Sequence, residues 1–173
     1  EGLALRSLGA IEHYQGRNDL AAQHAAGALA IFRRIGDQRG ESLALNAMGS
    51  VESARGETAR AMALFEQALH KAESVGDRRN ASIPMVNLAI TLHQMGQYEA
   101  SRQWLERFLA IKREIGDRPG EVWGLNHLGL LLHDQGDHDA AESLLRRALA
   151  IAREIGDRNT MGNALTYLGR VLG

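Results

Sequence analysis

The sequence predicts an all-α fold, a solenoid in which one pair of helices is repeated along the chain. The tripeptide Ile-Gly-Asp, once Val-Gly-Asp, ends at residues 37, 77, 117 and 157, which are 40 residues apart each time. A fixed period between about 20 and 50 residues is typical of stacked repeats. Apolar residues between these tripeptides recur in steps of three and four, as on one face of a helix. Repeat solenoids present extended binding surfaces, so we expect a scaffold.

When the chain is aligned on its 40-residue period, equivalent residues form columns. Two columns of glycine predict where the helices end. Glycine adopts the left-handed conformation that closes a helix at little cost, and each column recurs in every repeat. The aspartate after the second column is expected to cap the next helix through its side chain. The residues are Gly16, Gly56, Gly96 and Gly136, then Gly36, Gly76, Gly116 and Gly156, with caps at Asp37, Asp77, Asp117 and Asp157.

A third column lies inside the first helix of each repeat, at Gly9, Gly49, Ala89, Gly129 and Gly169. A glycine within a helix costs about 1 kcal/mol relative to alanine. Its recurrence therefore predicts a close approach of two helices that a larger side chain would block.

Each second helix carries an apolar stripe, for example Ala141, Leu145, Ala148, Ala152 and Ile155. The third repeat departs from this pattern at Ser101 and Lys112, and there we expect the stripe to shift towards Trp104, Phe108, Ile111 and Ile115. Pro119 falls in a first turn, where proline is tolerated. Pro84 is expected in a first turn as well, with Ser82 as the cap of a helix that starts late.

Composition excludes several classes of function. Lys and Arg number 20 and Asp and Glu 21, so the chain lacks the positive field that nucleic acid or an anionic membrane demands. There is no cysteine, and no apolar run approaches the roughly 18 residues that span a bilayer. We expect a cytoplasmic protein without a nucleic-acid or membrane partner. The chain starts at Glu1 and stops at Gly173 without polar caps, which predicts a fragment of a larger protein.

The columns resemble tetratricopeptide (TPR) repeats. The fourth repeat carries the pattern as Leu125, Leu128-Gly129, Gly136, Ala141, Leu145 and Ala148. The usual unit has about 34 residues, and this one is longer by six, inserted within residues 109–118 and 149–158. This long variety is similar to the repeats of LGN/Pins adaptors and of bacterial STAND-type regulators. HEAT repeats share the period but lack these columns.

The resemblance implies a right-handed α-α superhelical solenoid of about nine antiparallel helices. Residues 1–173 are then a single TPR domain, with repeats at approximately 2–36, 37–76, 77–116 and 117–156 and a final helix at 157–173.

The resemblance also implies that the first helices of successive repeats line a concave groove that holds an extended peptide. The side chains expected there are Arg6, Ala10, His13, Tyr14, Asn46, Ser50, Ser53, Val86, Ile90, His93, Gln94, Trp123, Asn126, Leu130, His133, Asp134, Thr166 and Arg170. Asn46 and Asn126 are the strongest candidates, because an amide can pair with a peptide backbone through both a donor and an acceptor. The alternative is a solvated polar face, or asparagines that bond neighbouring helices.

Val86, Ile90, Leu130 and Trp123 would make the middle of this groove apolar, as in a binding hot spot. The alternative is that some of them pack between adjacent first helices.

The histidines and the charged residues have plainer interpretations. His13, His93 and His133 recur at repeat spacing, about 10 Å apart, which is too far for one metal ion. His133, Asp134, Asp137 and His138 cluster at a turn, where exposed polar residues are expected, and this explains them better than a metal site does. No cofactor is expected. Arg146, Arg147, Arg153 and Glu154 are expected on a solvated outer face. Arg78, Arg79, Arg118 and Arg158 follow the turns, on an edge that an acidic partner could meet.

The sequence contains no catalytic motif beyond chance, so we expect no enzyme. Two hypotheses for binding remain: a scaffold that holds a partner's extended segment, and a ligand- or peptide-sensing module of a bacterial signalling protein or transcriptional regulator. The aromatic content of 5% disfavours a pocket for sugars or drug-like molecules. End-to-end self-association through Leu3, Leu5, Val171 and Leu172 is a third possibility.

Overall fold

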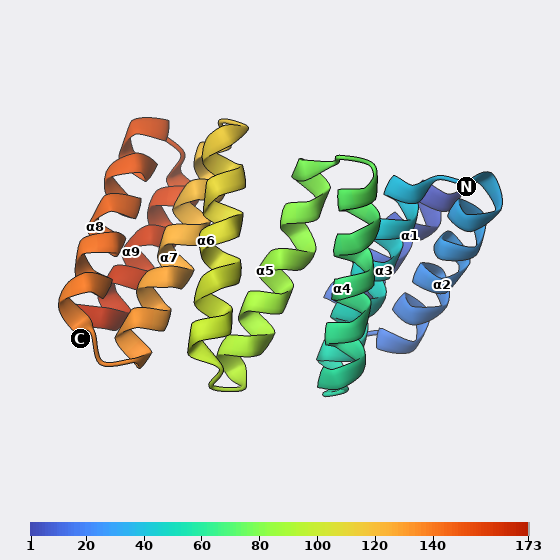
Figure 1. The fold of residues 1–173 in the computed structure, drawn as a ribbon, viewed down its shortest axis with the longest axis horizontal. Coiled ribbons are helices and arrows are strands. Elements are labelled where there is room, and N and C mark those ends of the chain that lie inside the picture. The colour runs from blue at the N-terminus through green and yellow to red at the C-terminus, as the bar shows by residue number, and fades with distance from the viewer. Residues whose placement is uncertain (173) are drawn as a thin grey trace. The chain divides into compact units, whose positions relative to one another are not determined.

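The chain is all-α, as the sequence predicts. In the computed structural model, which describes residues 1–172, nine α-helices follow one another and no strand is found among the described residues (Figure 1). The helices are α1 Gly2–Tyr14, α2 Asn18–Ile35, α3 Gln38–Ala54, α4 Thr58–Ser74, α5 Arg78–Gln94, α6 Tyr98–Glu114, α7 Arg118–Asp134, α8 His138–Ile155 and α9 Arg158–Leu172.

The helices form two compact units, Glu1–Thr91 and Leu92–Gly173, and the boundary falls within α5. In the first unit α1 packs on α2, α2 on α3 and α3 on α4, and α1 also contacts α3 directly. In the second unit α6 packs on α7, α7 on α8 and α8 on α9, and α7 also contacts α9. The first helices of successive repeats therefore touch each other within each unit, and the residues on them can form a shared surface.

The turns confirm the predicted helix ends. All eight turn glycines have φ between 67° and 86°, in the left-handed region where glycine is favoured. The side chain of each predicted aspartate accepts a hydrogen bond from the backbone N–H three residues later, at 2.9 Å for Asp37, 3.1 Å for Asp77, 2.9 Å for Asp117 and 2.7 Å for Asp157. One short segment thus ends one helix and starts the next.

The third column marks a close contact, as predicted, at three of its glycines. A Cβ on Gly49 would lie 2.5 Å from the Phe65 ring, one on Gly129 would lie 2.8 Å from Leu145 Cγ, and one on Gly9 would lie 3.3 Å from the Ala21 carbonyl. No described atom lies within 4 Å of a Cβ placed on Gly169. The glycine is therefore required only where a second helix packs across it.

The expectation for Pro84 is wrong. Helix α5 begins at Arg78, and Pro84 lies inside it and is buried. Ser82 is not a cap, because its hydroxyl donates to the Arg79 carbonyl at 2.7 Å within the helix. Gly76 and Asp77 start α5 as the equivalent residues start the other first helices, and this local signal overrides the proline.

The stripe of the third repeat does not shift either. Ser101 is fully buried and Lys112 is 9% exposed, so both occupy the core positions that apolar residues hold in other repeats. The Lys112 ammonium bonds Asp117 at 2.8 Å and lies 5.1 Å from the centre of the Phe108 ring. A buried lysine is tolerated when its charge is paired in this way.

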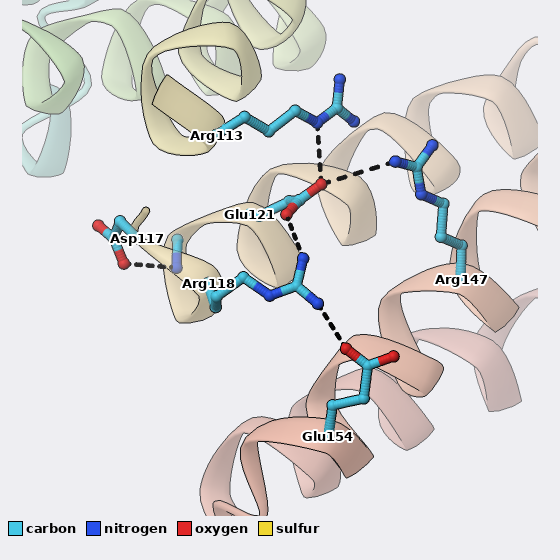
Figure 2. A network of polar contacts seen from close by, with 7 residues as sticks. Arg113, Asp117, Arg118, Glu121, Arg147 and Glu154 are labelled. Atoms are coloured by element: carbon cyan, nitrogen blue, oxygen red, sulfur yellow. Dashed lines mark hydrogen bonds and ion pairs between the residues drawn. The ribbon is translucent and has the colours of Figure 1, made fainter. Parts of the chain in front are cut away.

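A buried carboxylate connects three helices of the second unit (Figure 2). Glu121, on α7, is 3% exposed, and its oxygens lie 2.8 Å from Arg113 on α6, 3.0 Å from Arg118 and 3.7 Å from Arg147 on α8. Burial opposes ionisation, but the hydrogen bonds and charges of Arg113 and Arg118 hold the pKa of Glu121 below its usual value. Arg118 also pairs with Glu154. Arg147 and Glu154 lie on an exposed face, as expected, with side chains 56% and 65% exposed. Both also pair within the chain, as Arg118 does.

We expect Gly49→Ala to destabilise the protein and Gly169→Ala to stabilise it. The new methyl group would collide with the buried Phe65 ring in the first case, and overpacking costs about 1–3 kcal/mol. In the second case it meets open space, so the helix propensity of alanine adds up to about 1 kcal/mol. Urea denaturation followed by circular dichroism measures both changes. Equal effects at the two positions would contradict the helix-contact explanation.

Glu121→Gln should lower the free energy of unfolding by about 2 kcal/mol. Breaking a fully buried pair costs about 3–5 kcal/mol, and the half-exposed arginines reduce this. The matched control is Glu154→Gln, whose carboxylate is 65% exposed and which should cost less than about 1 kcal/mol. Because the pKa of Glu121 is lowered on folding, its contribution is present above the unfolded-state pKa and is lost as the pH falls. Thermal melts between pH 7 and pH 3 should therefore converge for wild type and Glu121→Gln, and parallel curves would exclude this role.

Candidate functional site: a groove over α1, α3 and α5

The first unit has two open hollows on the surface formed by its first helices. The Arg6 hollow, of about 400 Å³, is lined by Arg6, Ser7, Ala10, Ile11, Leu43, Asn46, Ala47 and Ile83. The His13 hollow, of about 260 Å³, is lined by His13, Ser50, Ser53, Ala54, Phe65, Asn87, Ile90 and Thr91. Helices α1, α3 and α5 supply all of these residues except Phe65, which comes from α4. We call this surface the groove.

An amide pair connects the two hollows. Asn46 lines the Arg6 hollow and Asn87 lines the His13 hollow, and the Asn87 amide donates to Asn46 Oδ1 at 2.8 Å. This bond leaves the N–H groups of Asn46 and the carbonyl oxygen of Asn87 for other partners. The hydroxyls of Ser50 and Thr91 donate to the backbone carbonyls of Asn46 and Asn87, at 3.2 and 2.8 Å. The amide pair can therefore offer a donor and an acceptor side by side.

The structure brings most of the predicted groove residues of the first unit to these hollows. Arg6, Ala10, His13, Asn46, Ser50, Ser53 and Ile90 line one or the other. Tyr14 and Val86 line neither: Tyr14 is 93% exposed at the end of α1, and Val86 is half-buried on α5.

The strongest candidate of the second unit is placed differently. Asn126 is only 2% exposed, and its Oδ1 has no hydrogen-bond partner. Tyr167 stands 41 residues after it, as Asn87 does after Asn46, but the Tyr167 hydroxyl bonds His127 Nε2 at 3.0 Å. The expectation that Asn126 presents an accessible amide is therefore wrong in this arrangement.

The same helices carry an aromatic cluster in place of an amide pair. Trp123 stacks on His127 with ring centres 3.7 Å apart, and His127 meets Tyr167 edge-on at 5.3 Å. Burial, with the charges of His93 and Arg170, lowers the pKa of His127 to about 4. Burial raises the pKa of Tyr167. The tyrosine hydroxyl therefore stays protonated and shares a hydrogen bond with a neutral imidazole.

The other predicted residues of the second unit differ in their exposure. Leu130 and His133 are half-buried, whereas Gln94, Asp134, Thr166 and Arg170 are exposed. His93 bonds Asp134 at 2.7 Å, and His133 Nδ1 lies 3.0 Å from His138 Nδ1. Among residues 1–172 no group of three or more His, Cys, Asp or Glu side chains is arranged to hold a metal ion.

Sequence reasoning missed Asn87, His127 and Tyr167. All three stand one residue after the predicted groove column, at equivalent positions of the repeat. A polar or aromatic residue at that position in three repeats was the available signal.

These observations define the class: a protein of stacked helix pairs whose first helices share a surface. The Tetratricopeptide repeat profile matches residues 2–74, 79–154 and 121–173. The chain belongs to the tetratricopeptide repeat family. Its fold supports a role as a protein-interaction scaffold with protein or peptide partners, and proteins of this kind are generally scaffolds without catalytic activity.

Solved structures share the fold at low sequence identity. BtubC (BKLC) from P. vanneervenii superposes with a TM-score of 0.84 at 19% identity, over 96% of this chain and 70% of that one. Aspartyl phosphate phosphatase F from Bacillus subtilis gives 0.90 at 14% identity, over 99% of this chain and 45% of that one. A Rap protein complexed with Competence and Sporulation Factor gives 0.81 at 20% identity, over 96% and 47%. The chain thus spans less than half the length of the last two.

No curated protein sequence matches the chain. None of the described helices combines the length and the apolar character that crossing a membrane requires.

His127 should remain neutral down to about pH 4. Because its pKa is lower in the folded than in the unfolded protein, its contribution to stability is complete above about pH 6.5 and is lost as the pH falls towards 4. Histidine NMR spectra should show a neutral His127 ring across this range. His127→Gln should make the loss of stability with falling pH less steep. Titration of His127 near pH 6.5 would contradict the burial argument.

Proposed function

We propose that this chain is a non-catalytic scaffold that binds an extended peptide segment of a partner protein in the groove over α1, α3 and α5. The Asn46–Asn87 pair is the observation that carries the proposal. It offers an N–H and a carbonyl oxygen between two hollows. An extended peptide backbone presents the complementary groups, because each residue has one donor and one acceptor.

The lining of the hollows supports a peptide rather than a small molecule. Their walls combine aliphatic side chains (Ile11, Leu43, Ile83 and Ile90) with hydroxyls and amides. Both are open, whereas a sensor of small molecules encloses most of its ligand in a deep pocket. The scaffold hypothesis is therefore favoured over the sensing module. The Rap protein complexed with Competence and Sporulation Factor supports the proposal as an example of this fold with a bound factor.

We expect the wild-type protein to enrich binders from a phage-displayed library of random 12-residue peptides. Asn46→Ala should lower the affinity for the enriched peptides about tenfold in fluorescence polarisation, because it removes the N–H donor and leaves the Asn87 amide unpaired. A polar group left unpaired in this way costs about 1–3 kcal/mol. Tyr14→Ala is the matched control, since Tyr14 lines neither hollow, and it should bind as the wild type does. Circular dichroism checks that both variants fold.

Two results would count against the proposal. One is the absence of any enriched peptide. The other is a set of peptides that bind folded Asn46→Ala as tightly as the wild type, which would move the site away from the groove.

A further inference from the structure

Three arginines converge on the buried carboxylate of Glu121 (Figure 2). Arg113 Nε and Arg147 Nη2 approach the same oxygen, Oε1, at 2.8 and 3.7 Å. Arg118 Nη1 lies 3.0 Å from the other oxygen, Oε2. In the described part of the chain, the one further carboxylate that contacts these arginines is Glu154, which pairs with Arg118. The network therefore holds more positive than negative charge.

A buried glutamate in this fold does not require three arginines. Glu41 occupies the equivalent position of the first unit and is also buried. Two cations serve it, Lys71 at 3.0 Å and Arg33 at 4.0 Å. The first unit has glutamines where Arg118 and Arg147 stand in the second. The burial of the carboxylate therefore does not account for the whole arginine cluster.

Arg147 is the arginine of the cluster that the chain itself engages least. Its contact with Glu121 is an ion pair at 3.7 Å, beyond hydrogen-bond distance, and its side chain makes no hydrogen bond to another described residue. The side chain is about half exposed. Arg146, the preceding residue on α8, instead pairs closely with Glu142. The five N–H donors of Arg147 are thus left for water or a ligand.

Arg113 approaches the same carboxylate oxygen from α6 and also has donors to spare. Its Nε bonds Glu121, which leaves its two terminal NH2 groups. The Arg113 Nε and the Arg147 Nη2 lie at most about 6.5 Å apart, since this is the sum of their distances to Oε1. One phosphate group that accepts a hydrogen bond of about 2.8 Å on each side spans such a gap.

The excess positive charge and the shape of the donors favour a phosphate as the ligand. A phosphate monoester carries about −1.5 to −2 charges at pH 7 and has three acceptor oxygens. One such group can therefore neutralise the excess charge and bond both arginines. Arginine pairs with phosphate through two parallel N–H···O bonds. A carboxylate brings a single charge and two oxygens, which Glu121 already supplies.

We propose that Arg113 and Arg147 form a binding site for a phosphorylated side chain of a partner protein, with Arg118 adding to the positive charge. Clusters of arginine are a recurring means of recognising phosphorylated segments. The site lies on α6 and α8 and shares no residue with the groove. The inference therefore does not rest on the proposed function of the groove.

The test uses synthetic pools of peptides that carry phosphoserine, phosphothreonine or phosphotyrosine between random residues, beside the same pools without phosphate. Wild type should bind a phosphorylated pool about tenfold more tightly in fluorescence polarisation, as charge-assisted bonds predict. Arg147→Gln should lose this preference, and Arg147→Lys should keep part of it. The matched control is Arg146→Gln, which removes the same charge from the next position of α8 and should bind as the wild type does. Circular dichroism checks that each variant folds.

Glu154→Gln provides a signature that a purely structural role of the arginines does not produce. It removes an exposed negative charge and releases Arg118. Phosphopeptides should therefore bind this variant about threefold more tightly than the wild type, while its stability changes little. Their binding to wild type should weaken below about pH 6, where the phosphate takes up a second proton. A glutamate in place of the phosphorylated residue should bind less tightly.

Inorganic phosphate, titrated at constant ionic strength and followed by the arginine Nε–H signals in NMR spectra, identifies the source of the group. A response that depends on Arg147, combined with phosphopeptides that bind no more tightly than the free ion, overturns the proposed partner. Equal binding of phosphorylated and plain peptides overturns the site, as do equal losses in Arg146→Gln and Arg147→Gln. None of these results bears on the groove, whose test depends on Asn46.

Discussion

The glycine–aspartate turn fixes the register on which the rest of each unit depends. The glycine ends one helix in a conformation that other residues adopt at a cost, and the aspartate caps the next helix by accepting from the N–H three residues later. Because this turn recurs every 40 residues, equivalent positions of successive first helices lie at the same distance from the start of their helix. Asn46 and Asn87, which are 41 residues apart, can meet only because α3 and α5 both start from such a turn.

Within this register the helices are held by close contact and by paired charges. Gly49 lets α3 approach Phe65 of α4, and Gly129 lets α7 approach Leu145 of α8. Glu41 and Glu121 occupy equivalent buried positions, and basic residues of neighbouring helices pair with both. Such pairs are weak sources of net stability but costly to break. They therefore favour one arrangement of the helices over others in which the carboxylate would lose its partners.

The same repeat produces different chemistry in the two units. In the first, Asn87 on α5 donates to Asn46 on α3, and the two form an accessible amide pair beside the Arg6 hollow. In the second, Tyr167 stands at the position equivalent to Asn87 and bonds His127, and Asn126 is buried with an unpaired oxygen. The backbone positions are equivalent, so the difference between the two surfaces lies in the side chains. The chemistry of each surface is therefore a property of individual columns rather than of the repeat as a whole.

The sequence by itself determined the helix class, the turns, the aspartate caps and the close contacts at Gly49 and Gly129, because each of these depends on a residue's own conformational preference or on the lack of a side chain. It also located most of the groove residues of the first unit, from Arg6 to Ile90. It did not determine the burial of Ser101, Lys112 and Asn126, the partners of Arg118 and Arg147, or the role of Asn87. Those features depend on which groups the neighbouring helices bring into contact. Only the tertiary structure decided them, because periodicity shows which face of a helix is buried but not which polar atoms meet there.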